Sequence, residues 1–280
     1  MPTSINISGK LLDLSQPKVM GILNVTPDSF YDGGKYNREG ILEQQVGKLL
    51  DEGADIIDIG GYSSRPDATD IPLAEEWGRV RLGIEAVRAQ NANIPISVDT
   101  FRAEVAQKAV ALGANMVNDI SGGELDEQMF EAVAEMKVPY IMMHMRGTPQ
   151  TMRQLTHYDN ILEELIDYFR LKIARLTALG LHDVVIDLGF GFAKTVEQNY
   201  YLLKHLAAFQ ILDKPMLVGV SRKSMIYRTL GISSEEALNG TSILNTVAIQ
   251  NGASILRVHD VKEAKEAIQL LDKLESASIA

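Results

Sequence analysis

Short apolar runs rich in β-branched residues recur along the chain, and a stretch with helical periodicity separates each run from the next. This alternation is typical of strand–helix units that build a parallel sheet. The predicted helices include Gly40–Leu50, Ala103–Leu112, Leu162–Leu179 and Glu235–Gln250. The predicted strands are Val19–Asn24, Asp55–Ile59, Ile94–Asp99, Met116–Ile120, Tyr140–His144, Val184–Leu188, Met216–Val220 and Ile255–His259.

A short glycine-containing joint recurs before several of these strands. Gly53, Gly113 and Gly252 lie in it, and Gly180 lies in a looser copy. Glycine just past a helix end adopts the left-handed conformation that closes the helix. About eight such units, with no G-x-G-x-x-G after any strand, favour an α/β fold of the closed (β/α)8 TIM barrel type over an open doubly wound sheet. The segment Ile5–Leu14 is predicted to form a short N-terminal β-hairpin that covers the barrel bottom.

Composition is consistent with one large globular domain. The chain has 280 residues, of which 46% are hydrophobic and 23% charged, and α/β barrels reach this length as a single domain. Because no low-complexity linker divides the chain, residues 1–280 are expected to form one TIM-barrel domain.

Charge and cysteine content narrow the function classes. The net charge of −10 argues against a nucleic-acid partner, which needs a surplus of Lys and Arg on one face. The chain has 0 cysteines, which excludes disulfides and thiolate metal sites and favours a reducing compartment. The N-terminus lacks the features of a signal peptide, and no apolar run is long enough to span a membrane. We therefore expect a cytoplasmic protein without a membrane partner.

Most of the predicted strands end on a polar or charged residue. Because barrel active sites form at the C-terminal ends of the strands, these residues together predict a site at the barrel mouth. Taken singly, each is equally well explained as a capping or turn residue. In chain order the residues are Asn24, Asp58, Asp99, Asn118, Asp119, His144, Asp187, Lys223, Arg257 and His259.

One group of these side chains is cationic or rich in donors. It consists of Lys223, Arg257 and His259, together with Arg65 in a loop. The loops after strands seven and eight of barrels are a recurrent phosphate site, so a phosphorylated substrate is expected. Residues Ser221–Ser224 also resemble a loop entering a helix, whose free N–H groups favour an anion. The alternative is a solvated basic surface.

A second group suits a flat, amino-substituted heterocycle. Asp99, Asn118 and Asp187 are predicted to project among apolar walls, where they accept and donate hydrogen bonds, and a buried carboxylate favours a substrate cation. His144 is interpreted as a structural histidine. Methionines that suit either packing under a flat ring or ordinary core filling flank it: Met142, Met143 and Met145.

Two glycine-rich loops, residues 24–34 and 60–67, are long for strand-to-helix connections. Long loops above a barrel mouth usually bind ligand or close over it, so we expect a pair of lids. The alternative interpretation is that their glycines are plain turn formers.

The motifs at these positions resemble those of dihydropteroate synthase, and the match covers nearly the whole chain. It runs over Met20–Phe30, Asp58–Gly61, Ser63–Pro66, Ser97–Thr100, Val117–Ile120, Asp187–Phe192, Gly219–Ser224 and Arg257–Asp260. The resemblance implies a transferase of folate biosynthesis. Such an enzyme condenses 6-hydroxymethyl-7,8-dihydropterin pyrophosphate with p-aminobenzoate, through a pterin methylene cation, to give 7,8-dihydropteroate and pyrophosphate.

The resemblance also implies residue roles. The pterin ring is held by Asp99, Asn118, Asp187 and Lys223. The pyrophosphate is held by Arg257, His259 and Asn24, the last through Mg2+. The catalytic set is Asp99, Lys223, Asn24, Asp32 and Arg65. Further substrate contacts come from Phe30, Ser63, Ser64, Pro66, Met142, Phe192 and Ser224, with Pro66, Phe192 and Ser224 in the p-aminobenzoate pocket that sulfonamide inhibitors occupy.

The chain departs from the family pattern at two residues, and the resemblance also implies an assembly. Leu188 stands where many members carry Pro, which puts the exact turn at Asp187 in question, and Ser64 stands where many carry Thr, which puts sulfonamide affinity in question. The family is typically homodimeric, so a homodimer is implied.

Three other interpretations remain. A pterin-binding methyltransferase domain, which acts on a reduced folate, shares the barrel and the pterin grip but needs no pyrophosphate clamp. A Schiff-base aldolase that uses Lys223 or Lys194 predicts trapping of substrate on that lysine by borohydride. A non-catalytic binding module is the third.

Overall fold

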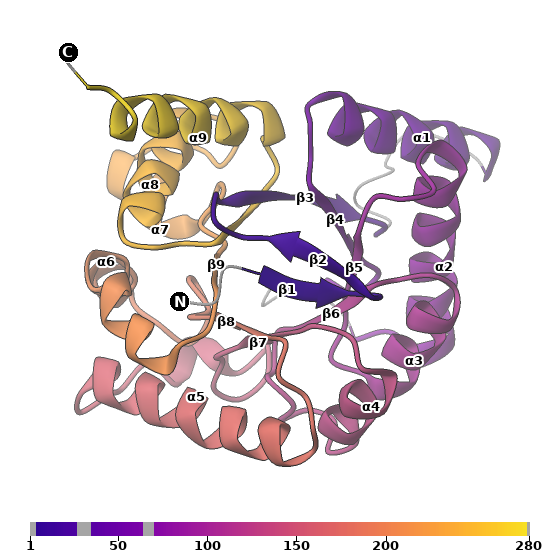
Figure 1. Cartoon of the computed structure of the whole chain (residues 1–280), viewed down its shortest axis with the longest axis horizontal. Coiled ribbons are helices and arrows are strands. Elements are labelled where there is room, and N and C mark those ends of the chain that lie inside the picture. The colour runs from indigo at the N-terminus through magenta and orange to yellow at the C-terminus, as the bar shows by residue number, and fades with distance from the viewer. Residues whose placement is uncertain (1–3, 27–34, 64–69, 279–280) are drawn as a thin grey trace.

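Eight parallel strands close into a barrel in this computed structural model, which describes residues 4–26, 35–63 and 70–278, without the side chains of residues 35–39. β10 pairs with both β3 and β9, so the last barrel strand completes the ring (Figure 1). This confirms the predicted (β/α)8 fold. The barrel strands are β3 (Lys18–Asn24), β4 (Ile56–Gly60), β5 (Ile96–Asp99), β6 (Met116–Asp119), β7 (Tyr140–Met143), β8 (Val184–Asp187), β9 (Met216–Val218) and β10 (Ile255–Val258).

Helices surround the barrel as an outer ring (Figure 1). They are α1 (Lys35–Asp51), α2 (Leu73–Gln90), α3 (Ala103–Ala111), α4 (Met129–Met136), α5 (Ile161–Ala178), α6 (Val196–Lys204), α7 (Ser224–Leu230), α8 (Leu238–Gln250) and α9 (Val261–Glu275), with short 3-10 turns η2 (Met152–Gln154) and η3 (Leu206–Leu212). The glycine joints have the predicted left-handed backbone, with φ of 86° at Gly53, 113° at Gly113 and 95° at Gly252.

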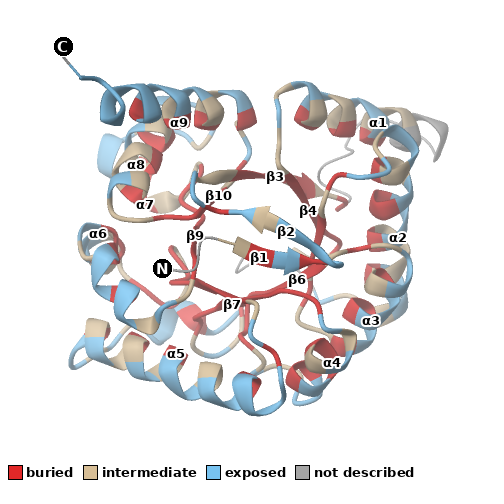
Figure 2. Cartoon of the chain, viewed as in Figure 1, coloured by how far each residue is buried: buried red, intermediate tan, exposed pale blue. Residues whose placement is uncertain are grey.

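Side chains alternate between two faces along each strand, and the two faces have different cores. Outward residues such as Val19, Ile57 and Val117 pack against the inner faces of the helices in the largest apolar cluster. Figure 2 shows the result: the barrel strands are mostly buried, as are the helix faces toward them, and the outer helix faces are exposed. The inward residues are therefore the ones available to a site inside the barrel.

The N-terminal hairpin closes the bottom of the barrel. β1 (Ser4–Ile7) and β2 (Lys10–Asp13) pair in antiparallel fashion and lie across the barrel in Figure 1. A second apolar cluster lies inside the barrel, between the hairpin and the inward side chains of the strands. The hairpin segment contributes Ile5, Ile7 and Leu14, and the strands contribute Met20, Ile56, Met116, Ile141, Val185, Leu217 and Ile255. The predicted hairpin is thus confirmed, and the apolar layer that it seals leaves only the opposite end for polar chemistry.

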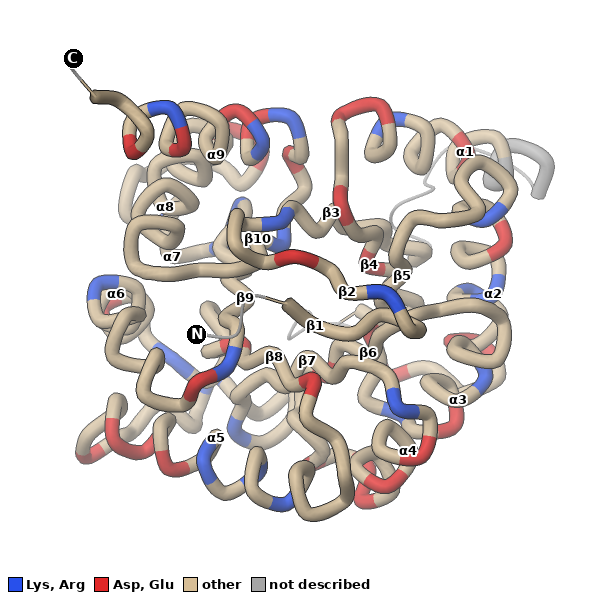
Figure 3. Tube along the Cα trace, viewed as in Figure 1, with Lys and Arg blue, Asp and Glu red and all other residues tan. Residues whose placement is uncertain are grey.

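The outer surface carries both charges. Figure 3 shows Lys and Arg interspersed with Asp and Glu along the helices seen in that view. None of the helices in the described ranges combines the length and the apolar character needed to cross a bilayer.

Candidate active site

Polar side chains form the inward layer of the barrel above the apolar layer that the hairpin covers. On β4 the outward neighbours Ile57 and Ile59 lie in the helix-facing core, so the alternating residue Asp58 points into the barrel. Asp99 and Asn118 are register partners on β5 and β6 and share this inward orientation. The predicted residues therefore come together because they occupy the same face of adjacent strands.

Arg257 on β10 links two carboxylates across the barrel mouth. Its Nε donates to Asp58 Oδ2 at 2.6 Å, and its Nη2 donates to Asp99 Oδ2 at 2.6 Å. Asn118 Nδ2 also donates to Asp58 Oδ2, at 3.1 Å. Asp58 is 0% exposed, and its sequence position at a strand end gave no indication of this partner. Asp58, predicted at the mouth only as a strand-end residue, thus gains a partner in each of the two groups, because it binds Arg257 of the cationic group and Asn118 of the heterocycle group.

Burial and neighbouring charge set the protonation of this cluster. Burial raises the pKa of Asp99 to about 7, repulsion from Asp58 adds to the rise, and the Arg257 guanidinium opposes it. Burial acts against the charge of Arg257, but attraction from Asp58 and Asp99 is stronger and raises its pKa above the ordinary value. Arg257 stays charged, while Asp99 can exchange a proton near neutral pH.

Asp187 and Lys223 form the other side of the mouth. Asp187 Oδ1 accepts a hydrogen bond from the Gly189 amide at 2.8 Å, and Lys223 Nζ donates to the Phe190 carbonyl at 2.6 Å. Burial raises the pKa of Asp187 and lowers that of Lys223 to about 8, while the attraction between them opposes both shifts. Leu188, between Asp187 and Gly189, packs in the helix-facing core and the turn forms without proline.

Arg222, the residue before Lys223, fixes the loop that carries Lys223. Arg222 has a left-handed backbone, with φ of 52°, and its guanidinium binds Asp260 through two hydrogen bonds of 2.9 and 2.8 Å. Ser221 Oγ lies 3.0 Å from His259 Nδ1, so this loop also contacts the end of β10. Of the basic motif, Lys223 is directed to the mouth and Arg222 to the scaffold, with Ser224 starting α7.

Asn24 ends β3 beside Gly60, where the absence of a side chain leaves room. A Cβ atom at Gly60 would lie 3.5 Å from Asn24 Oδ1 and 3.8 Å from Asp99 Oδ2. These are oxygen donors of the kind that Mg2+ prefers, and Mg2+ usually takes one or two protein ligands beside substrate phosphate and water. Among the residues described, no group of three His, Asp or Glu is placed to hold a metal ion.

Met142 does not face the mouth. It is 0% exposed in the cluster between barrel and helices, whereas Met143 packs with Met145 and Phe192 on the mouth side. A one-residue step along a strand reverses the side of the side chain, so Met143 rather than Met142 lies on the mouth side.

Several predicted site residues lie outside the described ranges. Ser63 is described and half-buried, within the second long loop. The expectation that the two loops act as lids stays a prediction, as do the roles of Phe30, Asp32, Ser64, Arg65 and Pro66.

His144 is buried beneath the mouth, in keeping with the structural role expected from its sequence. Its Nδ1 lies 3.0 Å from Nζ of Lys194, a residue that is itself only 8% exposed. Sequence reasoning considered Lys194 only as a nucleophile. The sequence signal for another role is that Lys194 directly follows an apolar loop rich in glycine and phenylalanine. A lysine in such a place is expected to be buried, and a buried charge needs polar partners.

A closed (β/α)8 barrel with carboxylates, an amide and two cations at its mouth defines an enzyme-type site for a polar ring and an anion. The chain belongs to the family of pterin-binding enzymes, whose model matches residues 20–259.

Individual relatives agree with this family. Dihydropteroate synthase of Escherichia coli is 43% identical over 272 residues, which cover 96% of this chain and 95% of the relative. The structure of Xanthomonas albilineans dihydropteroate synthase with 4-aminobenzoic acid is similar, with a TM-score of 0.92, 38% identity and coverage of 99% and 100%. That of the Yersinia pestis enzyme with a sulfonamide drug gives a TM-score of 0.90, 39% identity and coverage of 98% and 100%.

Proposed function

We propose that this protein is a folate-biosynthesis transferase that condenses 6-hydroxymethyl-7,8-dihydropterin pyrophosphate with p-aminobenzoate to give 7,8-dihydropteroate and pyrophosphate. The observation that carries the proposal is the Arg257 bridge between Asp58 and Asp99, with Asn118, Asp187 and Lys223 at the same mouth. Relatives named dihydropteroate synthase, one of them solved with 4-aminobenzoic acid, support it.

In this proposal the heterocycle lies against the inward carboxylates. Asp187 and Asn118 offer hydrogen bonds to its amino and ring nitrogen groups, and the Lys223 ammonium donates to an acceptor on the ring. Because these groups are already ordered by Gly189, Phe190 and the strands, little reorganisation is needed on binding. Preorganisation of this kind lets binding energy orient the reacting methylene group.

Bond cleavage then creates positive charge next to Asp99. The C–O bond to pyrophosphate breaks with both electrons leaving on oxygen, and the resulting methylene cation is conjugated with the pterin. The carboxylate of Asp99 stabilises this cation by Coulomb attraction, and Arg257 attracts the departing anion. Burial lowers the pKa of His259 to about 4, so its ring is neutral and contributes a hydrogen bond rather than charge. The amine nitrogen of p-aminobenzoate forms the new C–N bond and loses a proton.

The pyrophosphate is a reason to expect Mg2+ as the cofactor. Asn24 would hold the ion together with pyrophosphate oxygens, and the bound ion would neutralise charge on the leaving group. The proposed p-aminobenzoate pocket contains Phe192, Ser224 and Met143, with Pro66 from the second loop. Sulfonamides are proposed as inhibitors at that pocket, which the sulfonamide complex of the Yersinia pestis relative supports.

The test is product formation. The purified protein is incubated with the dihydropterin pyrophosphate, p-aminobenzoate and Mg2+, and dihydropteroate is measured by mass spectrometry. We expect product with all components and none when p-aminobenzoate or Mg2+ is left out. A protein that binds the pterin yet forms no dihydropteroate in the complete mixture would contradict the proposal.

A cytoplasmic location and a homodimer complete the proposal. A chain with 0 cysteines suits a reducing compartment. Exposed apolar side chains on the mutually contacting helices α6, α7 and α8, namely Tyr201, Leu230 and Ile243, are candidates for contact with a second copy. Light scattering is expected to give twice the 30.8 kDa chain mass, and a monomer at micromolar concentration would count against the homodimer.

A further inference from the structure

Lys194 is a buried charge that the proposed reaction does not use. It is 8% exposed at the end of the loop between β8 and α6. Its Nζ lies 3.1 Å from the Gly189 carbonyl oxygen and 3.0 Å from that of Phe192. The same atom lies 3.0 Å from Nδ1 of His144 and 3.4 Å from its carbonyl oxygen. One side chain therefore joins two ends of the β8–α6 loop to the end of β7.

The β8–α6 loop carries three features of the active site. Its Gly189 amide binds the Asp187 carboxylate, and its Phe190 carbonyl accepts from Lys223. The Phe192 ring lies with its centroid 5.0 Å from Lys223 Nζ. A displacement of this loop would thus disturb both the pterin groups and the proposed p-aminobenzoate pocket at once.

The backbone of this loop needs external support. Left-handed φ values occur at Gly189, at Gly191 and also at Ala193, where φ is 49° and a Cβ atom makes the conformation unfavourable. Tyr158 donates to the Ala193 carbonyl at 2.9 Å and supports one end. Lys194 supplies the hydrogen bonds to the carbonyls on the barrel side.

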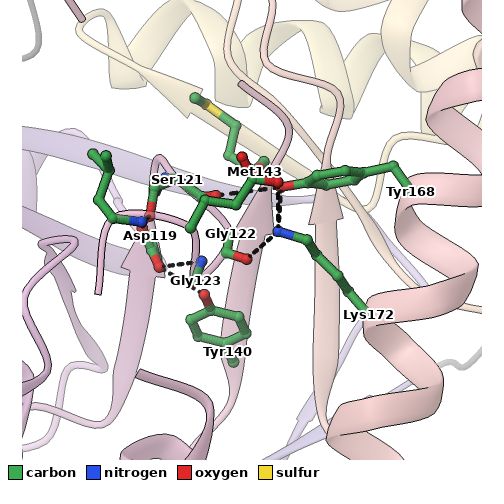
Figure 4. Close-up of polar contacts among 10 residues, drawn as sticks. Asp119, Ser121, Gly122, Gly123, Tyr140, Met143, Tyr168 and Lys172 are labelled. Carbon is green, nitrogen blue, oxygen red and sulfur yellow. Dashed lines mark hydrogen bonds and ion pairs between the residues drawn. The ribbon is translucent and has the colours of Figure 1, made fainter. Parts of the chain in front are cut away.

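The end of β7, which Lys194 contacts at His144, is itself fixed by hydrogen bonds from α5. Tyr168 of α5 donates to the carbonyl oxygens of Met143 and Ser121, at 3.2 and 3.3 Å, and the Lys172 ammonium donates to Tyr168 and to the Gly122 carbonyl (Figure 4). The His144 ring stands edge to face against Tyr168 at 4.8 Å. His144 is therefore a fixed anchor, and the loop is the part that Lys194 positions.

We propose that Lys194 is a positioning residue that fixes the β8–α6 loop to the end of β7, and so places Asp187, Lys223 and Phe192 for the two substrates. This inference rests on the proposed function for its kinetic consequences. Lys194 does not serve as a nucleophile, because its amine is enclosed by four polar contacts within the described structure.

The lowered pKa of Lys194 distinguishes a positioning role from a role in stabilising the fold. Burial lowers the pKa of Lys194 to about 7, although the Asp187 carboxylate opposes the shift. The folded state thus carries the charged amine at a cost, and the relief of this cost in a variant with an apolar side chain offsets part of the hydrogen bonds that it loses. Removing Lys194 is expected to cost activity rather than stability.

The first experiment compares Lys194→Met with the wild type in steady-state kinetics and thermal unfolding. We expect kcat/KM for p-aminobenzoate to fall by about tenfold or more, since small misplacements of a site are costly, with Tm unchanged within a few degrees. The matched control is Lys265→Met, which removes a 2.7 Å pair with Asp55 at the far end of the barrel and should leave kcat/KM unchanged. Wild-type kcat/KM in Lys194→Met would overturn the proposal.

The second experiment restores the amine chemically and exploits a chain with 0 cysteines. Lys194→Cys is alkylated in denaturant with 2-bromoethylamine, which recreates a lysine-like ammonium, or with iodoacetamide as the neutral control, and both are refolded. We expect most of the activity to return with the amine only. Equal kcat/KM in the two folded adducts would overturn the proposal, even if Lys194→Met failed to fold.

A readout that does not depend on turnover keeps the inference separate from the proposed function. Hydrogen–deuterium exchange over residues 188–195 should be faster in Lys194→Met than in the wild type, and unchanged in Lys265→Met. Unchanged exchange in both variants would overturn the positioning role. An inactive wild-type protein with this exchange pattern would instead contradict the proposed function alone.

Discussion

At the scale of single residues, the barrel mouth contains buried charges that lower the stability of the fold and serve the reaction. Asp58, Asp99 and Asp187 are three carboxylates inside one barrel end, where two cations, Arg257 and Lys223, compensate them. Burial dominates the titration of Asp99, so its carboxylate form is disfavoured although it touches a guanidinium. Such groups are expected where a reaction needs charge in a place that folding alone would leave neutral.

The pH dependence of stability tests this point. The folded-state pKa of Asp99 is about 7, above its ordinary value of 3.8, so the folded protein binds that proton more tightly than the unfolded chain. The cost of burying the carboxylate is therefore absent below 3.8 and complete above about 7. We expect Asp99→Asn to raise Tm by a few degrees at alkaline pH, with a gain that shrinks toward acid, while activity falls sharply.

Scanning calorimetry across pH measures this gain. Asp55→Asn is the control, because Asp55 pairs favourably with Lys265 at the barrel bottom and its loss should give no gain at any pH. A Tm difference between Asp99→Asn and wild type that stays constant from acid to alkaline pH would refute the burial explanation.

At the scale of elements, strand-to-helix loops decide where functional groups point. Strand positions and ends could be predicted from apolar runs to within about two residues, because a buried parallel strand needs a continuous apolar stretch. Met142 was expected at the mouth, but it lies in the helix-facing core, and the sequence could not separate it from Met143 because both are apolar and both faces of these strands are buried. The partnership of Asp58 with Arg257 was also beyond prediction, because it joins β4 and β10, which lie on either side of β3 and are brought near each other only when the barrel closes.

Gly189 provides the prediction at this scale. Its φ is 69°, and a Cβ atom there would overlap the His144 carbonyl oxygen. We expect Gly189→Ala to displace the β8–α6 loop, to lower kcat/KM by about tenfold or more, as expected for a misplaced site, and to lower Tm. Steady-state kinetics and thermal unfolding provide the measurements.

Gly180→Ala is the matched control for this substitution. Gly180 has a similar φ of 84° but open space around the added atom, so only the backbone strain of about 1 kcal/mol is expected there. Equal kinetic losses in the two variants would show that close packing against His144 has no special part.

At the scale of the whole molecule, the barrel separates its two ends. The polar layer at the mouth binds and the apolar layer at the bottom holds the fold together, with the hairpin β1–β2 as its cover. The fold class and the hairpin were predictable because both follow from patterning and turns. The residue roles that depend on contacts between residues far apart in the sequence, such as that of Lys194 with His144, were not.

Substitution within the hairpin should therefore change stability without changing chemistry. Ile5 is 2% exposed in the bottom cluster, and Ile5→Ala is expected to lower the unfolding free energy by about 2–4 kcal/mol. The kcat of the folded protein should not change. Leu11→Ala, on the same hairpin but 73% exposed, is the control and should stay within about 0.5 kcal/mol of wild type. Urea unfolding gives both values, and a reduced kcat in Ile5→Ala would contradict the separation of the two ends.

The pairing of β10 with β3 has a consequence for synthesis on the ribosome. The hairpin and β3 leave the ribosome before β10 (residues 255–258), which is the last neighbour of β3 in the barrel. The cover of the barrel bottom therefore waits, with its apolar side chains unburied, until the later barrel strands have been made. We expect the nascent chain to depend on a chaperone that shields the hairpin until β10 has been made.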